Sequence, residues 1–264
     1  MLELCRKYNA IEDGDQVLEV GTGWVHWMAT VLRLFYKVEV TVFDVWDNRQ
    51  LAAYKHYCEQ LRQAADKVFV MEPAQREQVY TLLDNISAAN TFDELYRMLG
   101  FEYLIDPTGA LKQFGNDSFD LIVSADVLEH IRQGILLEFV RDSYRVLKPG
   151  GYSIHQIDLS DHLSHYDHTS SRKNYYRYSK KMWTRWLENE VQYFNRIQRS
   201  EWLNLFIMEG FELVEERPEF SDLGNIKINK DYNNLSQQDL ECTLVTVIYR
   251  KPLKDACKRS DATY

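Results

Sequence analysis

The sequence predicts an α/β fold in which a mostly parallel sheet is covered by helices on both faces. Short apolar runs that are typical of buried strands occupy 16–20, 38–45, 101–107, 119–125 and 152–158. Stretches with a helical spacing of apolar residues separate these runs. Because strands that alternate with helices are joined by right-handed crossovers, the strands are expected to lie parallel in one sheet.

The helices of this pattern lie between the expected strands. Apolar residues recur at helical spacing in 26–36, 48–65 and 133–147, and 66–100 is also expected to be helical. The stretch KPGG, which follows the helix at 133–147, is expected to act as a stop.

The second half of the chain is less regular. A helix is expected over 182–210 and strands over 211–218 and 240–252. A closing hairpin of this kind predicts an antiparallel C-terminal strand. We expect one domain, 1–264, because no Pro/Gly linker or repeat interrupts it. Its insertions are expected to form a lid or the acceptor side, and they lie near 66–100, 159–181 and 219–238.

Composition and charge narrow the class of protein. Of the 264 residues, 45% are hydrophobic and 27% are charged, which is usual for a soluble globular protein. The net charge of −9 argues against nucleic-acid binding, since phosphate contacts need a basic surface. No apolar run approaches the ~18 residues that cross a bilayer, and the N-terminus lacks a secretion signal. We expect a cytoplasmic protein with neither nucleic acid nor membrane as a partner. The sequence does not decide whether the protein forms a homo-oligomer.

The cysteines support the same compartment. They are scattered, without the spacing of metal ligands, which fits idle thiols under reducing conditions. They are Cys5, Cys58, Cys242 and Cys257.

The ends of the expected strands predict a ligand site, because an open parallel sheet binds its ligand beyond the carboxyl ends of its strands. Gly21 and Gly23 follow the first strand and allow backbone torsions that a Cβ would disfavour. Asp44 ends the second strand, where a carboxylate can accept hydrogen bonds from a ribose. A dinucleotide site would need a third glycine where this chain has His26, so the glycines alone leave the ligand open.

Four motifs in order carry a resemblance that narrows this choice: VLEVGTG, VTVFD, FDLIVSADVLEHI and RVLKPGGY. Together they resemble the class I S-adenosylmethionine-dependent methyltransferases, in particular the small-molecule branch with VLEHI and LKPGG motifs. The resemblance covers about residues 15–158, with a weaker echo in GFELVE at 210–215. It implies a Rossmann-like seven-stranded sheet. Val25 stands where the family often has another glycine, which puts the detailed shape of the loop in doubt.

The resemblance implies that S-adenosylmethionine is the cofactor and S-adenosylhomocysteine the product. Gly21 and Gly23 would let the chain pass close to the methionine part. Glu19 would orient the loop or receive the cofactor's amino group through water, and Asp44 would hold the ribose hydroxyls.

Further positions complete this implied cofactor site. Asp106 would meet the adenine, and Ser124 and Ala125 would line the floor near the sulfonium. Their neighbours in the implied site are Thr22, Val45 and Pro107.

The stretch HQIDLSDHLSHYDH predicts the acceptor side of the site, because it follows the fifth strand and is rich in histidines and aspartates. A hydroxyl acceptor needs a base, and histidine has an ordinary pKa near working pH, ~6.5. We expect His162 or His165 to be that base, with His130 as a third candidate and Asp158 at the strand end contacting the acceptor.

Two further interpretations concern the same region. Asp158, His162 and His165 have the chemistry of divalent-metal ligands, although loop histidines are more often solvated or paired, so no metal is assigned. The basic stretch SRKNYYRYSKK is either a solvated loop or a lid in which Arg172 or Arg177 clamps an anionic acceptor.

The sequence therefore predicts methyl transfer from S-adenosylmethionine to a small molecule, most simply to a hydroxyl of a sugar, a polysaccharide precursor or a secondary metabolite. The alternatives are N- or C-methylation and a non-catalytic relative that keeps the fold as a scaffold. A nicotinamide-dependent oxidoreductase is a further class, but it would need the missing third glycine.

Overall fold

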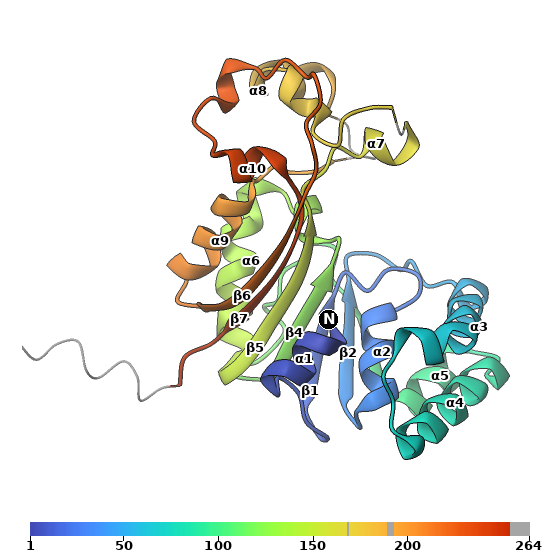
Figure 1. Cartoon of the computed structure of the whole chain (residues 1–264). Helices are drawn as coiled ribbons and strands as arrows, with labels where there is room; N and C mark the ends of the chain where they lie inside the picture. Colours follow the sequence, from blue (N-terminus) through green and yellow to red (C-terminus); the bar gives the residue numbers. More distant parts are fainter. Residues whose placement is uncertain (168, 189–192, 254–264) are drawn as a thin grey trace, which may run out of the picture. The chain divides into compact units, whose positions relative to one another are not determined.

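A computed structural model, which describes residues 1–167, 169–188 and 193–253, shows a seven-stranded sheet flanked by helices (Figure 1). The strand order is β3-β2-β1-β4-β5-β7-β6. β1 pairs in parallel with β2 and β4, β2 pairs in parallel with β3, and β6 pairs antiparallel with β7. The predicted mostly parallel sheet with an antiparallel C-terminal strand is confirmed. The strands are β1 (Gln16–Val20), β2 (Glu39–Asp44), β3 (Phe101–Ile105), β4 (Phe119–Ala125), β5 (Leu147–Asp158), β6 (Glu212–Phe220) and β7 (Cys242–Arg250).

Ten α-helices and three short 3-10 helices are assigned in the described residues. The α-helices are α1 (Leu2–Tyr8), α2 (Trp27–Phe35), α3 (Leu51–Val68), α4 (Pro73–Ala88), α5 (Phe92–Leu99), α6 (Gln133–Val146), α7 (Leu163–Tyr166), α8 (Lys180–Trp186), α9 (Arg199–Met208) and α10 (Gln237–Glu241). The 3-10 helices are η1 (Leu128–His130), η2 (Asn174–Arg177) and η3 (Lys230–Tyr232).

The chain divides into two compact units. Unit 1 comprises Met1–Ser124, Asp142–Ile154 and the chain from Lys251 onward. Unit 2 comprises Ala125–Arg141 and His155–Arg250. β5 contributes its first part to unit 1 and its last part to unit 2.

Unit 1 is built on strands whose two faces are both buried, as expected for parallel strands under helices. Val17 and Leu18 of β1 and Val40 and Val42 of β2 are all buried. In this unit α4 packs against α2 and α3, and α5 packs against β3 (Figure 1). The stretch 66–100 was predicted to be helical, and this is confirmed by α4 and α5.

Unit 2 has an aromatic core of its own. It consists of Tyr175, Tyr176, Trp183, Phe194 and Tyr232, all of them buried. In the same unit α9 packs against β6 and β7. Part of the basic stretch at 171–181 is thus core rather than a solvated loop.

Two predicted boundaries are wrong. KPGG does not interrupt the chain between helix and strand but lies inside β5, because backbone hydrogen bonds hold it to Lys251. The helix expected over 182–210 is broken into α8 and α9. Arg196 has a left-handed φ of 57°, and Gln198 begins α9 with a capping box, so helical hydrogen bonding restarts there. Residues 189–192 of that expected helix lie outside the described residues.

Two sequence expectations concern compartment. None of the described helices has the length and apolar character needed to span a bilayer. Cys5, Cys58 and Cys242 are buried free thiols, while Cys257 lies outside the described residues.

Candidate active site

In unit 1, the loop after β1 carries several of the predicted site residues. Gly21 and Gly23 have φ values of 68° and 60°, in the left-handed region that glycine adopts without strain. A Cβ built on Gly23 would meet no atom within 4 Å. The loop therefore borders open space at this glycine, and the backbone torsion explains why a glycine suits the position.

Glu19 stabilises this loop through hydrogen bonds. Its carboxylate accepts hydrogen bonds from the hydroxyl of Thr22 at 3.1 Å and from the backbone N–H groups of Ala29 at 3.1 Å and Met28 at 3.3 Å. The side chain is buried, and burial raises its pKa to about 7 even though these three donors act in the opposite direction. These contacts are those of a residue that orients the loop.

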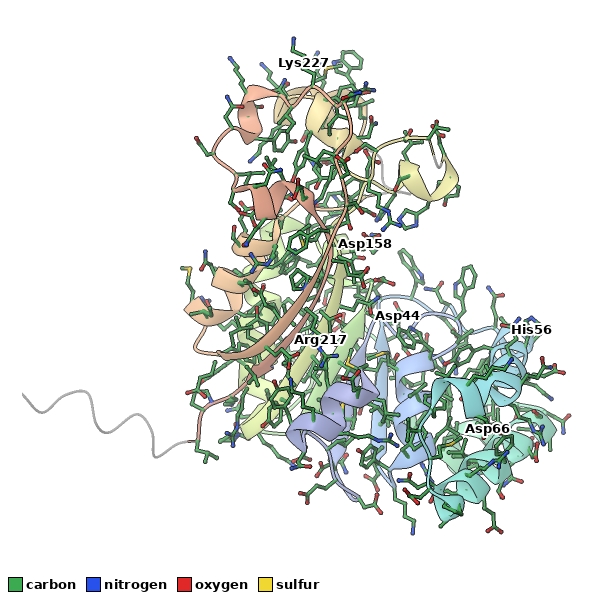
Figure 2. All side chains as sticks on the ribbon, viewed as in Figure 1. Asp44, His56, Asp66, Asp158, Arg217 and Lys227 are labelled. Carbon is green, nitrogen blue, oxygen red and sulfur yellow. The ribbon has the colours of Figure 1, made fainter. Side chains whose placement is uncertain are left out.

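Asp44 lies at the end of β2 (Figure 2). One carboxylate oxygen accepts a hydrogen bond from the N–H of Gly23 at 2.9 Å, and the other accepts one from the N–H of Val45 at 2.7 Å. Each carboxylate oxygen can accept a second hydrogen bond. A fixed, nearly buried carboxylate beside the glycine loop is therefore able to receive two hydroxyls of a ligand.

His26 extends the hydrogen-bond network that Glu19 and Thr22 form. Its backbone is left-handed, with φ 41°, at the start of α2. Nδ1 lies 2.8 Å from the Thr22 hydroxyl and Nε2 lies 2.8 Å from the Tyr96 hydroxyl. Because Thr22 donates its single hydroxyl proton to Glu19, Nδ1 must donate to Thr22, and Nε2 accepts from Tyr96. Burial lowers the pKa of His26 to about 4, which keeps this neutral tautomer.

The sequence indicated only that His26 replaces a glycine, and it gave no signal for its partner Tyr96. That pairing depends on α5 packing beside the loop, which nothing in the spacing of the motifs predicts. A polar residue at a position requiring φ > 0 was the one available hint.

Asp106 and Pro107 follow β3. One oxygen of Asp106 accepts hydrogen bonds from the N–H of Thr108 at 2.9 Å and from its hydroxyl at 2.7 Å, and these bonds lower the pKa of Asp106. The backbone N–H of Asp106 donates to the carbonyl of Asp44 at 3.0 Å, which fixes the loop start. Ser124 is buried at the end of β4.

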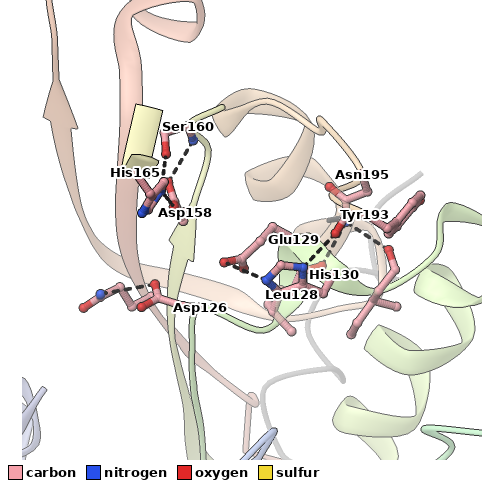
Figure 3. A network of polar contacts seen from close by, with 11 residues as sticks. Asp126, Leu128, Glu129, His130, Asp158, Ser160, His165, Tyr193 and Asn195 are labelled. Atoms are coloured by element: carbon pink, nitrogen blue, oxygen red, sulfur yellow. Dashed lines mark hydrogen bonds and ion pairs between the residues drawn. The ribbon is translucent and has the colours of Figure 1, made fainter. Parts of the chain in front are cut away.

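In unit 2, the predicted site residues His165 and Asp158 contact each other (Figure 3). Nε2 of His165 lies 3.2 Å from Oδ2 of Asp158 and 3.2 Å from the Ser160 hydroxyl. The second oxygen of Asp158 accepts the N–H of Ser160 at 2.8 Å. The His165 side chain is 53% exposed, so a ligand can reach its ring.

His162 occupies a different environment. Its ring packs 4.7 Å from that of Phe194 and 5.1 Å from that of His130, measured between centroids. Burial lowers the pKa of His162 to about 4, and the neighbouring histidines lower it further. An imidazole with so low a pKa is a weak proton acceptor at neutral pH.

His130 has a tautomer that its partner determines. Nδ1 lies 2.7 Å from the carbonyl oxygen of Tyr193, which can only accept, so Nδ1 carries the proton in the neutral ring. Nε2 then has a lone pair, and it lies 4.0 Å from a carboxyl oxygen of Glu129 (Figure 3).

Glu129 is a buried carboxyl, with 2% of its surface exposed. Neither of its carboxyl oxygens has a hydrogen-bond partner among the described residues. Burial raises its pKa well above the ordinary value and the charges of Asp126 and Asp158 raise it further, although the nearby backbone N–H groups of Glu129 and Asp158 lower it in part. Glu129 belongs to the VLEHI motif, in which only His130 was predicted to be a site residue.

Asn195 fixes the turn that carries Glu129 and His130. Its side-chain amide donates to the carbonyls of Leu128 at 2.8 Å and Ile131 at 3.1 Å. Its backbone N–H donates to the carbonyl of Glu129 at 2.7 Å. The sequence offered no signal for this residue, which is 67 positions from Leu128.

The basic stretch has a mixed structure. Arg172 and Arg177 are exposed, whereas Lys173 is buried and donates to the Tyr175 hydroxyl and to Gln198, each at 3.1 Å. Burial lowers the pKa of Lys173 to about 7. His168, also part of the predicted histidine-rich segment, lies outside the described residues.

The metal-ligand interpretation can be compared with this geometry. Within the part of the chain that the structure describes, no group of three or more His, Cys, Asp or Glu side chains has an arrangement that could hold a metal ion. Asp158, His162 and His165 do not form such a group.

Comparisons with known proteins agree on the fold. A family model described as a methyltransferase domain matches residues 2–216. No curated protein sequence matches the chain. Among similar solved structures, a methyltransferase from Methanosarcina mazei has 15% identity and a TM-score of 0.54, over 94% of this chain and 98% of that one.

Two other structures are similar at the level of the fold. An S-adenosylmethionine-dependent methyltransferase from Mesorhizobium loti has 13% identity and a TM-score of 0.50, over 94% of this chain and 96% of that one. Phosphoethanolamine N-methyltransferase 2 from Haemonchus contortus, solved with S-adenosyl-L-methionine, has 14% identity and a TM-score of 0.52, over 95% of this chain and 52% of that one.

Proposed function

Because the chain belongs to the family of methyltransferase domains, we propose that it transfers the methyl group of S-adenosylmethionine to a hydroxyl of a small molecule, such as a sugar, a polysaccharide precursor or a secondary metabolite. The chain is an S-adenosylmethionine-dependent methyltransferase, and the hydroxyl acceptor is the proposed part. The observation that carries it is the contact of His165 with Asp158, at 3.2 Å.

The residues of the glycine loop fit the cofactor. Open space beside Gly23 leaves room for its methionine part, and the Asp44 carboxylate has free acceptor capacity for the ribose hydroxyls. Glu19 would keep the loop in shape, and Asp106 would lie toward the adenine. When bound, the cofactor supplies the electrophilic methyl group on its sulfonium.

His165 would act as the general base. The Asp158 carboxylate accepts a hydrogen bond from Nε2, so the proton of the neutral ring lies on Nε2 and the lone pair lies on Nδ1. Nδ1 would accept the proton of the acceptor hydroxyl. Asp158 would be a positioning residue that holds the ring and stabilises its protonated form. His162, with its pKa of about 4, is the weaker candidate.

Arg172 and Arg177 would contact an anionic group of the acceptor where it has one. Both are exposed and able to do so.

The cofactor part is tested by calorimetric titration with S-adenosylmethionine and S-adenosylhomocysteine. We expect micromolar binding of both, and at least a ~10-fold weaker affinity in Asp44→Ala, which removes the acceptor for the ribose. Asp66→Ala, on an exposed face of α3, is the matched control and should bind as the wild type does. Failure of the folded wild-type protein to bind either compound would contradict the cofactor assignment.

The base is tested by the pH profile of turnover with an acceptor found by screening hydroxylated compounds. We expect His165→Gln to lower kcat by roughly 100-fold and to remove the acidic limb of the profile, with unchanged cofactor affinity. His162→Gln should retain the limb. If both variants behave alike, His165 is not the base.

A further inference from the structure

The carboxyl group of Glu129 is the feature of unit 2 that the proposed chemistry leaves unexplained. It is almost fully buried, and both of its oxygens lack a hydrogen-bond partner among the described residues. Leaving a buried carboxyl without partners costs roughly 1–3 kcal/mol or more. A buried polar group that lacks partners has a specific reason in a native structure, such as a catalytic role or contact with a bound molecule or ion.

The titratable side chains that interact with Glu129 are acceptors or negative charges, while the backbone N–H groups of Glu129 and Asp158 are close enough to lower its pKa in part. Nε2 of His130, 4.0 Å away, has its lone pair free because Nδ1 donates to a backbone carbonyl. Asp126 and Asp158 are close enough for their charges to raise the pKa of Glu129 (Figure 3). In the described part of the chain, no Lys or Arg forms an ion pair with any of these three carboxyls.

The turn at Asp126 is held in place by Gln156. Asp126 has a left-handed φ of 55°, which aspartate adopts more readily than most residues. Its N–H donates to the carbonyl of Gln156 at 3.0 Å, and one carboxyl oxygen accepts from the Gln156 amide at 3.4 Å. The turn is held so that Asp126 and Glu129 lie within electrostatic reach of each other.

We infer that the methyl acceptor carries a protonated amine, and that this ammonium group binds to the carboxylates of Glu129 and Asp126 and to Nε2 of His130. The inference rests on the proposed function and names its substrate class: small hydroxylated amines, such as amino sugars and amino alcohols. An ammonium has three N–H donors and one positive charge. It therefore supplies partners for the acceptor atoms around Glu129 and reduces the repulsion between the carboxyls.

A divalent metal is the other cation that carboxylates attract. Among the described residues, no group of three or more His, Cys, Asp or Glu side chains is arranged to hold one, and metal ligands must lie about 2.0–2.6 Å from one point. An ammonium has looser requirements, with donor–acceptor distances of about 2.7–2.9 Å in no fixed polyhedron. The geometry thus favours the organic cation.

The first experiment measures binding without any turnover. The full chain is melted with increasing ethanolammonium chloride, and with ethylene glycol plus sodium chloride at the same ionic strength. We expect ethanolammonium to raise the Tm of the wild type by about 3 °C when it is present at ten times its Kd. Ethylene glycol should not. Glu129→Gln, which keeps the shape and removes the charge, should lose the shift.

Glu138→Gln is the matched control, because it makes the same change at an exposed position of α6 in the same unit. It should retain the full shift. No shift in the wild type, or an equal shift in Glu129→Gln, would overturn the inference. So would a larger shift with magnesium chloride that Glu129→Gln abolishes, because the bound cation would then be a metal.

The second experiment measures methyl transfer as release of S-adenosylhomocysteine from paired acceptors. Each pair has one free amine and one acetamide, such as glucosamine with N-acetylglucosamine. We expect kcat/KM at least 10-fold higher for the amine, and a KM raised about 10-fold by Glu129→Gln with unchanged cofactor affinity.

The outcomes separate this inference from the proposed function. Equal transfer to both members of a pair overturns amine recognition and leaves O-methylation standing. Transfer to the nitrogen supports amine recognition and contradicts the hydroxyl proposal. An ethanolammonium shift without transfer to any hydroxyl also counts against only the hydroxyl proposal.

Discussion

Two buried glutamates, one in each unit, differ in how the protein satisfies them. Glu19 and Glu129 are each 2% exposed, and burial raises the pKa of both. Glu19 receives three hydrogen bonds from Thr22, Met28 and Ala29. Glu129 receives none from the described residues, and other carboxylates lie near it.

The difference distinguishes a structural group from a group that waits for a ligand. Three hydrogen bonds within its own loop and helix offset part of the cost of burying the Glu19 carboxylate. Among the described residues, no such bonds offset the cost of burying Glu129. Two residues of the same type and exposure therefore differ in how much of the cost of burial the free protein compensates.

The largest effect that tests this comparison is expected for Glu19→Ala. The change leaves the Thr22 hydroxyl and two backbone N–H groups without an acceptor in a buried place, which should lower the free energy of unfolding by about 3 kcal/mol. Urea unfolding followed by circular dichroism measures it. Glu59→Ala, on an exposed turn of α3, should change the unfolding free energy by less than about 0.5 kcal/mol. Equal effects would remove the distinction.

An intermediate effect is expected for Asn195→Ala. The truncation removes the amide that binds the carbonyls of Leu128 and Ile131, and should cost about 2 kcal/mol of unfolding free energy. Because this amide holds the turn that carries Glu129, the KM for the acceptor should rise as well. Steady-state kinetics and urea unfolding measure the two. A loss of stability with no change in KM would mean that the turn keeps its shape without Asn195.

The smallest effect, with the opposite sign, is expected for Glu129→Gln. Since burial raises the pKa of Glu129, folding favours its protonated form. Wild-type stability from this group is present below the ordinary glutamate pKa and is lost as the pH rises toward the raised one. Glutamine does not titrate, so the variant should match the wild type in acid and exceed it at higher pH. Thermal melts of both proteins from pH 4.5 to 8.5 measure the difference, and a variant that is no more stable than the wild type at pH 8.5 would refute it.

Much of the fold could be predicted from the sequence, because it depends on local patterns. β1 and β4 have the predicted bounds, since uninterrupted apolar runs between turn residues leave little choice. The break between α8 and α9 could not be predicted. The apolar spacing continues across it, and the capping box at Gln198 and the left-handed Arg196 are the features that end the helix.

The candidate site residues of each unit also differ in how far the sequence predicts them. Asp44 and the glycines lie at strand ends, where the topology alone brings them together. Asp158 was also expected at its strand end, and the structure pairs it with His165. The lack of hydrogen-bond partners at the Glu129 carboxyl could not be predicted from the sequence, because it depends on how segments distant in the chain pack around it.

The buried chain from Tyr96 through His26 and Thr22 to Glu19 has a consequence for how the loop behaves before it meets any ligand. Each link fixes a rotamer or a backbone torsion of the free protein, including the left-handed torsion at His26. A loop that is already ordered loses little conformational entropy when it closes on a partner. Recognition at this loop should therefore resemble the docking of a rigid body, and loosening the chain at Tyr96 would turn it into coupled folding and binding.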